Sequence, residues 1–380
     1  MTQKHSRPVI PTDPDPRFVA FMEKSNAIEG EKLAAAIPRE YMQPSVIRGL
    51  AGLAVSLALY AGSLAGIAWV HNWYLAVPFI LIAGLGGWGL HCIGHDCGHG
   101  AFSRNRQLNF AIGHFVLLPL MYPFHAWRHE HNTHHAHTNN LELDVDWRPV
   151  SEDLYRRMPR RYRFVYFSTR SWAIWAGTIN YWAKSGFRPS YYPKRAMQRD
   201  VRRSILFVAV VGGAYLGALT YFTGWQGLLL YFVAPWFAIH AWFSITTLMQ
   251  HSAEDLPYLP DRYWTRNASR LLVTTDFVYP RWLLFCTHYI SLHTAHHVAP
   301  SVPYYNLPKA QTALRQQYPD MVRVEKASIG RLWNIVRKCR FYDPISGLYA
   351  TRPMFKSDSA SAPTLSSSTG ATPPTTAGAA

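Results

Sequence analysis

Two long stretches without a charged side chain constrain the fold more than any other feature of the sequence. Residues 49–95 contain no Asp, Glu, Lys or Arg, and neither do residues 204–253. A bilayer core is about 30 Å thick and is crossed by roughly 20 helical residues, so each stretch is long enough to cross, turn and cross back. The sequence therefore predicts two transmembrane helical hairpins.

Short breaks near the middle of each stretch indicate where the hairpins turn. The first break lies at residues 71–72 and the second at residues 223–224. Trp73 and Trp225 follow the two breaks directly, and this position suits the aromatic belt at a membrane–water interface. The four predicted crossings are residues 49–70, 73–90, 204–222 and 225–249.

The basic residues predict the orientation of the chain. All 38 Lys and Arg residues lie outside the two hairpins, so the positive-inside rule makes the segments that carry them cytoplasmic. The formal net charge of +16 then faces anionic lipid head groups or an acidic partner protein. No nucleic-acid-binding module accompanies this charge, and we expect no nucleic acid partner.

We therefore expect an all-α integral membrane protein with four transmembrane helices in two hairpins and a cytoplasmic helical cap. The expected location is a bacterial inner (plasma) membrane, with both termini and the functional site in the cytoplasm. Ser, Thr, Pro and Ala dominate the end of the chain, which predicts a disordered tail. The predicted segments are 1–48 (cytoplasmic), 49–95 (hairpin 1), 96–203 (cytoplasmic, with interfacial helices), 204–253 (hairpin 2), 254–350 (cytoplasmic) and 351–380 (tail).

The histidines predict a metal site. Ten of the 18 histidines lie between His91 and His137, a density that packing alone does not require. Three clusters have helical spacing: H-x-x-x-H at residues 95–99, and H-x-x-H-H at residues 131–135 and 293–297. Residues three or four apart lie on one face of a helix, so each cluster can direct its imidazoles at a common point. The predicted hairpins return all three clusters to the same side of the membrane.

The number of imidazoles indicates two metal ions. Imidazole suits Zn, Cu, Fe or Ni, so the ligand type alone does not identify the metal. Eight neutral nitrogens exceed the four ligands of a tetrahedral zinc site, which makes two metals the simplest interpretation. Soluble di-iron proteins use Glu and Glu-x-x-His on four helices, and the three clusters contain no glutamate at such positions.

The sequence around the clusters resembles the three histidine boxes of membrane fatty acid desaturases, most closely the acyl-lipid Δ12 (omega-6) type. The matching segments are Gly94–Ser103, Trp127–Asn139 and His293–His297, and the resemblance spans roughly residues 90 to 310. It implies two irons that use O2 and two electrons to insert a cis double bond into a lipid-linked acyl chain. The box ligands that it implies are His95, His99, His131, His134, His135, His293, His296 and His297.

A ninth histidine ligand outside the boxes is also implied by the resemblance. The leading candidate is His251, which follows the fourth predicted crossing, and His288 is the alternative. Hydrogen-bonding support around the ligands is expected from some nearby polar residues. The candidates for this support are His91, His129, His288, Asp96 and Asp144.

Electrons must come from a separate protein. The sequence has no G-x-G-x-x-G motif after a strand and no haem-binding module. We expect a ferredoxin as the donor, with a b-type cytochrome as the alternative. The position of the double bond rests only on the resemblance, and the sequence leaves open whether a lipid, coenzyme A or a carrier protein holds the acyl chain.

Two other functions compete with desaturation. A hydroxylase, a ketolase or another di-iron oxygenase acting on a lipid or carotenoid could use the same scaffold, and product analysis separates these enzymes. A histidine-rich metal transporter is a remote alternative, because transport requires polar ligands along a path near the bilayer midplane. Only His240 lies within a predicted crossing.

Overall fold

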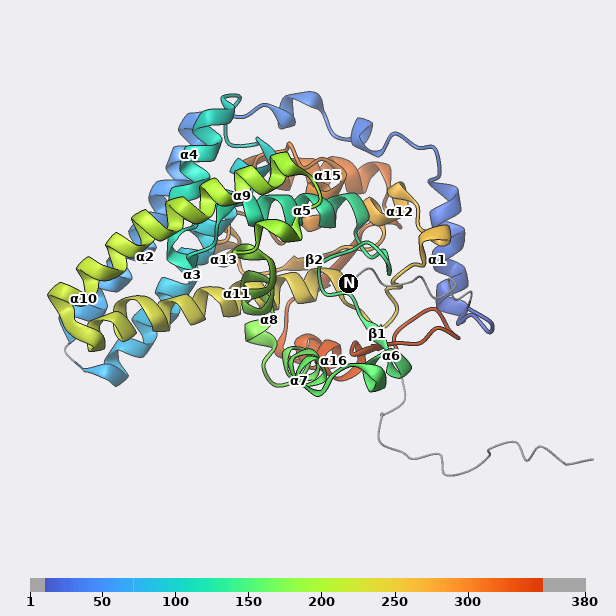
Figure 1. Ribbon diagram of the computed structural model, residues 1–380. Helices are drawn as coiled ribbons and strands as arrows, with labels where there is room; N and C mark the ends of the chain where they lie inside the picture. Colours follow the sequence, from blue (N-terminus) through green and yellow to red (C-terminus); the bar gives the residue numbers. More distant parts are fainter. Residues whose placement is uncertain (1–10, 71, 351–380) are drawn as a thin grey trace, which may run out of the picture. The chain divides into compact units, whose positions relative to one another are not determined.

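The computed structural model of the protein describes residues 11–70 and 72–350, and this part of the chain is mostly helical (Figure 1). The helices of the first half are α1 (Pro16–Ala27), α2 (Val46–Val70), α3 (Trp73–His99), α4 (Arg106–Val116), α5 (Phe124–His137), α6 (Glu152–Arg157), α7 (Arg160–Thr169) and α8 (Gly177–Tyr181). Those of the second half are α9 (Arg195–Phe207), α10 (Gly213–Leu228), α11 (Ala234–His251), α12 (Arg266–Leu271), α13 (Arg281–Cys286), α14 (His293–Val298), α15 (Leu307–Gln317) and α16 (Ile329–Lys338). The predicted tail and residue 71 of the first predicted turn lie outside the described residues.

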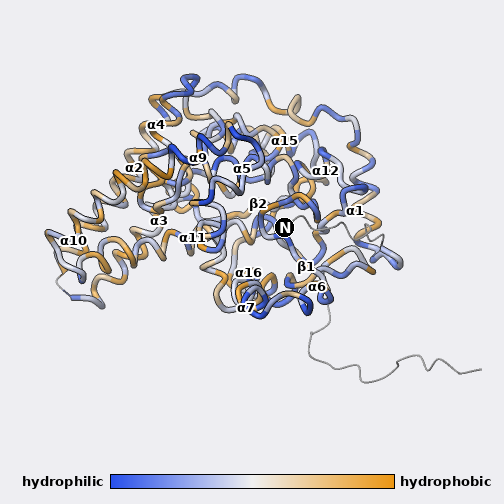
Figure 2. The backbone as a smooth tube through the Cα atoms, viewed as in Figure 1, coloured by the Kyte–Doolittle hydropathy of each residue, from blue (hydrophilic) through white to orange (hydrophobic). Residues whose placement is uncertain are grey.

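Three helical stretches in the described part of the chain are long and apolar enough to cross a membrane. They are α2, α3 and the stretch Arg195–His251, which joins α9, α10 and α11 through two π-helical turns. Large apolar side chains such as Trp69, Tyr221 and Phe222 are exposed on these helices. Figure 2 shows the same hydrophobic character along α2, α10 and α11. An apolar surface of this extent is typical of a membrane protein.

The third stretch is divided at Gly224, the residue at which the sequence places the second turn. Gly224 has φ +67° and ψ −175°, a conformation that glycine adopts readily because it lacks a Cβ atom. The rings of Tyr215 and Phe232, which flank Gly224 at similar distances along the chain, lie 6.3 Å apart. The two limbs therefore fold back on each other, and Figure 1 shows α10 and α11 diverging from this turn.

Helix α3 packs against both α2 and α11 through glycines that allow close contact. A Cβ atom at Gly86 would lie 2.6 Å from the backbone nitrogen of Tyr60 in α2. A Cβ atom at Gly84 would lie 2.6 Å from the Cβ of Ala238 in α11. Any larger residue at these positions would separate the helices, so the glycines fix the place of α3 and of the histidines at its end.

The segment between α3 and the second box bends sharply. Helix α4 is followed by a short 3-10 helix, Leu118–Leu120, and α5 begins after Pro123. The chain bends by 98° between the two arms of this segment. The two arms could form a fourth membrane span only if they were counted together as one bent span. Residues 106–137, which lie in the segment predicted to contain interfacial helices, therefore do not form one straight helix.

Two small parallel strand pairs add to the predicted all-helical fold. Strand β1 (Val150–Ser151) pairs with β4 (Phe341–Tyr342), and β2 (Thr275–Val278) pairs with β3 (Arg323–Lys326). In the second pair Thr275 lies opposite Arg323 and Val278 opposite Lys326. The β2–β3 pair matters for the functional site because β2 packs against α14 and α11.

Candidate metal centre

Four helices deliver nine histidines to one region of the molecule. Helix α3 carries the first box at its C-terminal end and is followed by Gly100, whose φ of +73° is the left-handed conformation common after a helix end. Helices α5 and α14 carry the second and third boxes, and α11 ends at His251. In each box the histidines four residues apart lie on the same face of their helix.

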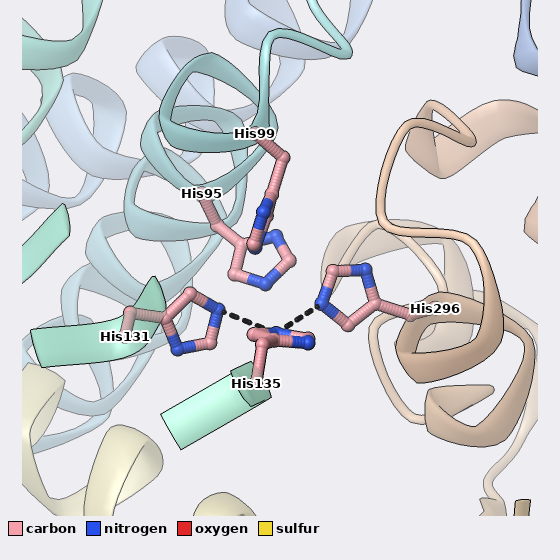
Figure 3. Close-up of side chains that lie close together, drawn as sticks. All are labelled: His95, His99, His131, His135 and His296. Carbon is pink, nitrogen blue, oxygen red and sulfur yellow. Dashed lines mark hydrogen bonds between the residues drawn. The ribbon is translucent and has the colours of Figure 1, made fainter. Parts of the chain in front are cut away.

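Five of these histidines form cluster 1, in which one ring nitrogen of each lies within 4.8 Å of the others. The Nε2 atom of His135 lies 3.1 Å from that of His131 and 3.0 Å from that of His296. Figure 3 shows the imidazoles pointing toward one another from three helices. Cluster 1 consists of His95, His99, His131, His135 and His296.

The remaining four histidines form cluster 2. Ring nitrogens of His134, His251 and His297 lie within 4.8 Å of one another. The Nε2 atom of His293 lies 2.9 Å from that of His251 and 3.0 Å from that of His297, so His293 completes the group. All four side chains are buried.

The adjacent histidines of the second and third boxes point to different clusters. His134 belongs to cluster 2 and His135 to cluster 1, whereas His296 belongs to cluster 1 and His297 to cluster 2. Neighbouring residues of an α-helix point about 100° apart. Two adjacent histidines can therefore direct their imidazoles to two different sites. The motif H-x-x-H-H thus supplies both clusters, whereas helical spacing alone predicts that the imidazoles of one box share a common point.

The geometry distinguishes the two candidates for the ninth position. His251 lies among the ring nitrogens of cluster 2, as described above. His288 instead has its Nε2 atom 2.7 Å from the hydroxyl of Ser56, and its ring packs 4.5 Å from that of Tyr304. The structure therefore brings His251 to the box histidines and holds His288 apart from them.

The chemistry of both clusters suits metal binding. Burial lowers the pKa of His131, His135 and His296 well below the usual value, so these rings are neutral and can offer a lone pair. Both ring nitrogens of buried His95 lack a hydrogen-bond partner. Two nitrogens bound at about 2.1 Å and at right angles to each other would lie roughly 3.0 Å apart, close to the separations seen here.

A buried carboxylate orients one histidine of cluster 2. The Nδ1–H of His134 donates to Asp144 Oδ1 at 2.9 Å, and the backbone N–H of Asn139 donates to Oδ2 at 2.7 Å. Burial would lower the pKa of His134, but the charge and hydrogen bond of Asp144 outweigh it and raise the pKa. With Nδ1 protonated, the lone pair of Nε2 faces His251, 3.2 Å away. Support of this kind is expected of a residue that orients a metal ligand.

The other predicted supporting residues have different contacts. Asp96 accepts the backbone N–H of Tyr304 at 2.9 Å, and its other oxygen lies 3.8 Å from His95 Nδ1, too far for a hydrogen bond. His91 stacks on Trp88 at 4.9 Å and has no hydrogen-bond partner on either nitrogen. His129 lies 3.5 Å from a carboxylate oxygen of Asp200, away from both clusters.

Sequence reasoning missed a buried carboxylate beneath the third box. Asp276, on β2, is 1% exposed and accepts the backbone N–H of Thr294 at 2.8 Å. It lies far from the box in sequence and belongs to no spacing pattern. Its only sequence signal is an acidic residue within an otherwise apolar and polar-neutral run.

A cavity reaches both clusters. Its apolar wall includes Trp88, Phe243 and Ile290, and its polar side includes Glu130, whose pKa is raised by burial to about 7. The histidines that line it include His95 and His131 of cluster 1 and His134, His251 and His293 of cluster 2.

Comparison with known proteins connects this arrangement to one family. Residues 71–326 match the family model described as fatty acid desaturase. An sn-1 oleoyl-lipid 12-desaturase from Picosynechococcus sp. is 31% identical over 86% of this chain and 94% of its own length. An sn-1 acyl-lipid omega-3 desaturase (ferredoxin) from Synechocystis sp. is 33% identical over 75% and 80% of the two chains. A chloroplastic omega-6 fatty acid desaturase from Spinacia oleracea is 28% identical over 82% and 69%.

Proposed function

The chain belongs to the fatty acid desaturase family, and we propose that it inserts a cis double bond into an acyl chain of a membrane lipid. The proposed substrate is an oleoyl chain and the proposed position is Δ12, because relatives matched over most of their length are named oleoyl-lipid 12-desaturases. The proposed cofactor is a pair of irons, one held by cluster 1 and one by cluster 2.

One observation carries this proposal: a single cavity is lined by histidines of both clusters and by large apolar side chains. An acyl chain in this cavity would lie against Trp88 and Phe243, whose rings pack 5.3 Å apart, with its reacting carbons beside the histidines. An apolar wall excludes water and protects a reactive oxidant from side reactions. The same wall would hold the acyl chain in a fixed position relative to the metal sites.

The iron pair, when bound, would supply the oxidant that breaks an unactivated C–H bond. Overall, two hydrogens from the acyl chain, two electrons and two protons reduce O2 to two waters. The chain's own residues hold the reactants in place: imidazoles of both clusters line the cavity, and Asp144 keeps His134 in the tautomer that presents Nε2. On the polar side Glu130 accepts hydrogen bonds from Ser185 at 2.5 Å and Tyr122 at 3.2 Å, which fixes that wall.

The proposed membrane arrangement has four crossings, a cytoplasmic cap and cytoplasmic termini, in a bacterial inner membrane. Support comes from the fold-back at Gly224 and from the absence of Lys and Arg between residues 49 and 95 and between 204 and 253. A cysteine probe placed at Gly224 should react with a membrane-impermeant reagent added outside the cell. Reaction of a probe at Ser357 instead would reverse the orientation.

We also propose a ferredoxin as the electron donor. One relative carries ferredoxin in its name, and the basic residues of this chain favour an acidic partner. Charge-guided docking weakens as salt screens the interaction. Turnover with purified ferredoxin should therefore fall as ionic strength rises, and turnover that is independent of salt would count against this partner.

The decisive test of the reaction is expression in a host that makes only saturated and monounsaturated lipids. Lipid analysis should reveal linoleoyl chains formed from oleoyl chains. An inactive His131→Ala variant in the same host controls for background synthesis. Hydroxylated or keto products, or conversion of a carotenoid with unchanged acyl chains, would contradict desaturation.

A further inference from the structure

The third histidine box lies on a helix that cannot hold its own position. Helix α14 has six residues, and the first N–H groups of any helix have no partner within it. This short helix nevertheless supplies His296 to cluster 1 and both His293 and His297 to cluster 2. Any rotation of α14 would disturb both clusters, so its N-terminus must be fixed from outside.

Asp276 fixes the first turn of α14. Its Oδ1 atom accepts the backbone N–H of Thr294 at 2.8 Å and the Thr294 hydroxyl at 3.0 Å. The hydroxyl of Thr274 donates to the same Thr294 oxygen at 2.8 Å. Asp276 is itself held in place because β2 pairs with β3 and because the N–H of Phe277 donates to the carbonyl of Ser291 at 3.1 Å.

Gln311, on α15, completes the connection. Its Oε1 atom accepts the backbone N–H of Ala295 at 2.9 Å, and its Nε2 atom donates to Asp276 Oδ2. Both side chains are buried, at 1% exposure for Asp276 and 5% for Gln311. Two successive N–H groups of α14 are thereby held by two side chains that are also bonded to each other.

We propose that Asp276 and Gln311 are a positioning pair that sets the rotation of α14, so that His296 faces one metal and His293 and His297 face the other. The inference rests on the proposed role of these histidines as ligands. It assigns the pair no contact with the substrate or the metal. It differs from the support given by Asp144, which holds a single imidazole of cluster 2.

The hydrogen-bond directions of the pair define a sharp test. In Asp276→Asn the side chains at positions 276 and 311 would both be amides, and each needs its oxygen to accept an N–H group of α14. Two N–H donors would therefore face each other, and turning either amide over would only move this clash to α14. In Gln311→Glu two buried carboxylates would face each other. The double variant Asp276→Asn/Gln311→Glu restores every bond, because the new amide at position 276 would donate to the new carboxylate at position 311. Each side chain would still keep an oxygen for an N–H group of α14, and charge and volume are nearly unchanged.

The experiment measures iron per chain and turnover for the wild type, both single variants and the double variant, each purified as the full chain. We expect each single variant to lose iron from both clusters and to lose turnover by about 10- to 100-fold, as is typical when support of metal ligands is removed. In the double variant, iron content and turnover should both return to within about threefold of the wild-type values. Asp153→Asn, at an exposed carboxylate paired with Arg157, controls for the loss of one carboxylate elsewhere.

Single variants that match the wild type would overturn the inference, and so would a double variant no better than the weaker single. If the singles fail to accumulate, recovery of accumulation and iron in the double variant supports the pairing, and no recovery contradicts it. Wild-type protein that binds two irons but forms no double bond would refute the proposed reaction and leave the positioning test intact.

Discussion

The two histidine clusters differ in enclosure and in charge. Cluster 1 has five histidines, of which His99, His131 and His135 are partly exposed, whereas every histidine of cluster 2 is buried. Cluster 2 has a carboxylate, Asp144, bonded to one of its imidazoles. Among the described residues, no carboxylate is hydrogen-bonded to an imidazole of cluster 1.

This difference indicates two ways to organise a metal site. In cluster 1 packing orients an imidazole: the ring of His131 stacks on Trp127 with centroids 4.8 Å apart. Cluster 2 is held by a hydrogen bond that fixes both the orientation and the tautomer of His134. We therefore expect cluster 1 to exchange its metal more readily and cluster 2 to depend more on a single polar contact.

Replacing a single histidine of either cluster should cause the largest loss of iron and activity. We expect His131→Ala to leave about one iron per chain, held by cluster 2, and His251→Ala to leave about one iron, held by cluster 1. Neither variant should form a detectable product, because the proposed reaction needs both metals. Iron analysis with lipid analysis of the same preparations checks this, and full activity in either variant would contradict the assignment.

Replacing the carboxylate should affect only one cluster. Asp144→Asn removes the charge that holds His134, and we expect a loss of about 10- to 100-fold in metal affinity or turnover. The loss should be confined to cluster 2. Asp96→Asn serves as the comparison, since Asp96 bonds the backbone of Tyr304 rather than an imidazole. Equal losses from the two variants would remove the distinction between the clusters.

The two clusters should release iron to a chelator at different rates. Because three imidazoles of cluster 1 are partly exposed, its metal should leave first when a strong chelator is added to the purified protein. We expect two phases of iron release of similar amplitude. In Asp144→Asn the slower phase should become faster, and a single phase in the wild type would mean that enclosure does not govern release.

The smallest effect should come from His288. Its side chain bonds Ser56 and lies outside both clusters, so His288→Ala should keep about two irons per chain. The change leaves a buried hydroxyl without its partner, at a cost of about 1–3 kcal/mol in the free energy of unfolding. Thermal unfolding in detergent measures this cost. Loss of iron in His288→Ala with retention in His251→Ala would transfer the ligand role to His288.

Much of the site can be predicted from the sequence because its signals are local. The boxes follow from helical spacing, and the turn at Gly224 follows from a glycine within an uncharged stretch. Asp144 is a candidate because it lies close to the second box in sequence. His251 can be ranked above His288 only by resemblance, since nothing in the spacing relates either residue to the boxes.

The features of the site that the sequence does not predict depend on contacts between segments that are distant in sequence. Asp276 is held against α14 in part because β2 pairs with β3, which lies much farther along the chain. The division of each His-His pair between two clusters requires helices on both sides of α5 and α14. The cavity likewise needs walls from α3 and α11, which no periodicity in a single segment can indicate.

The most direct test of the central claim is an iron-specific anomalous scattering map of the iron-loaded full-length protein. We expect two separate peaks. One should lie about 2 Å, the usual length of an imidazole–metal bond, from nitrogens of cluster 1, and the other should lie at that distance from nitrogens of cluster 2, including His251. A single peak, or a second peak bound by His288 in place of His251, would contradict the division of the nine histidines into two metal sites.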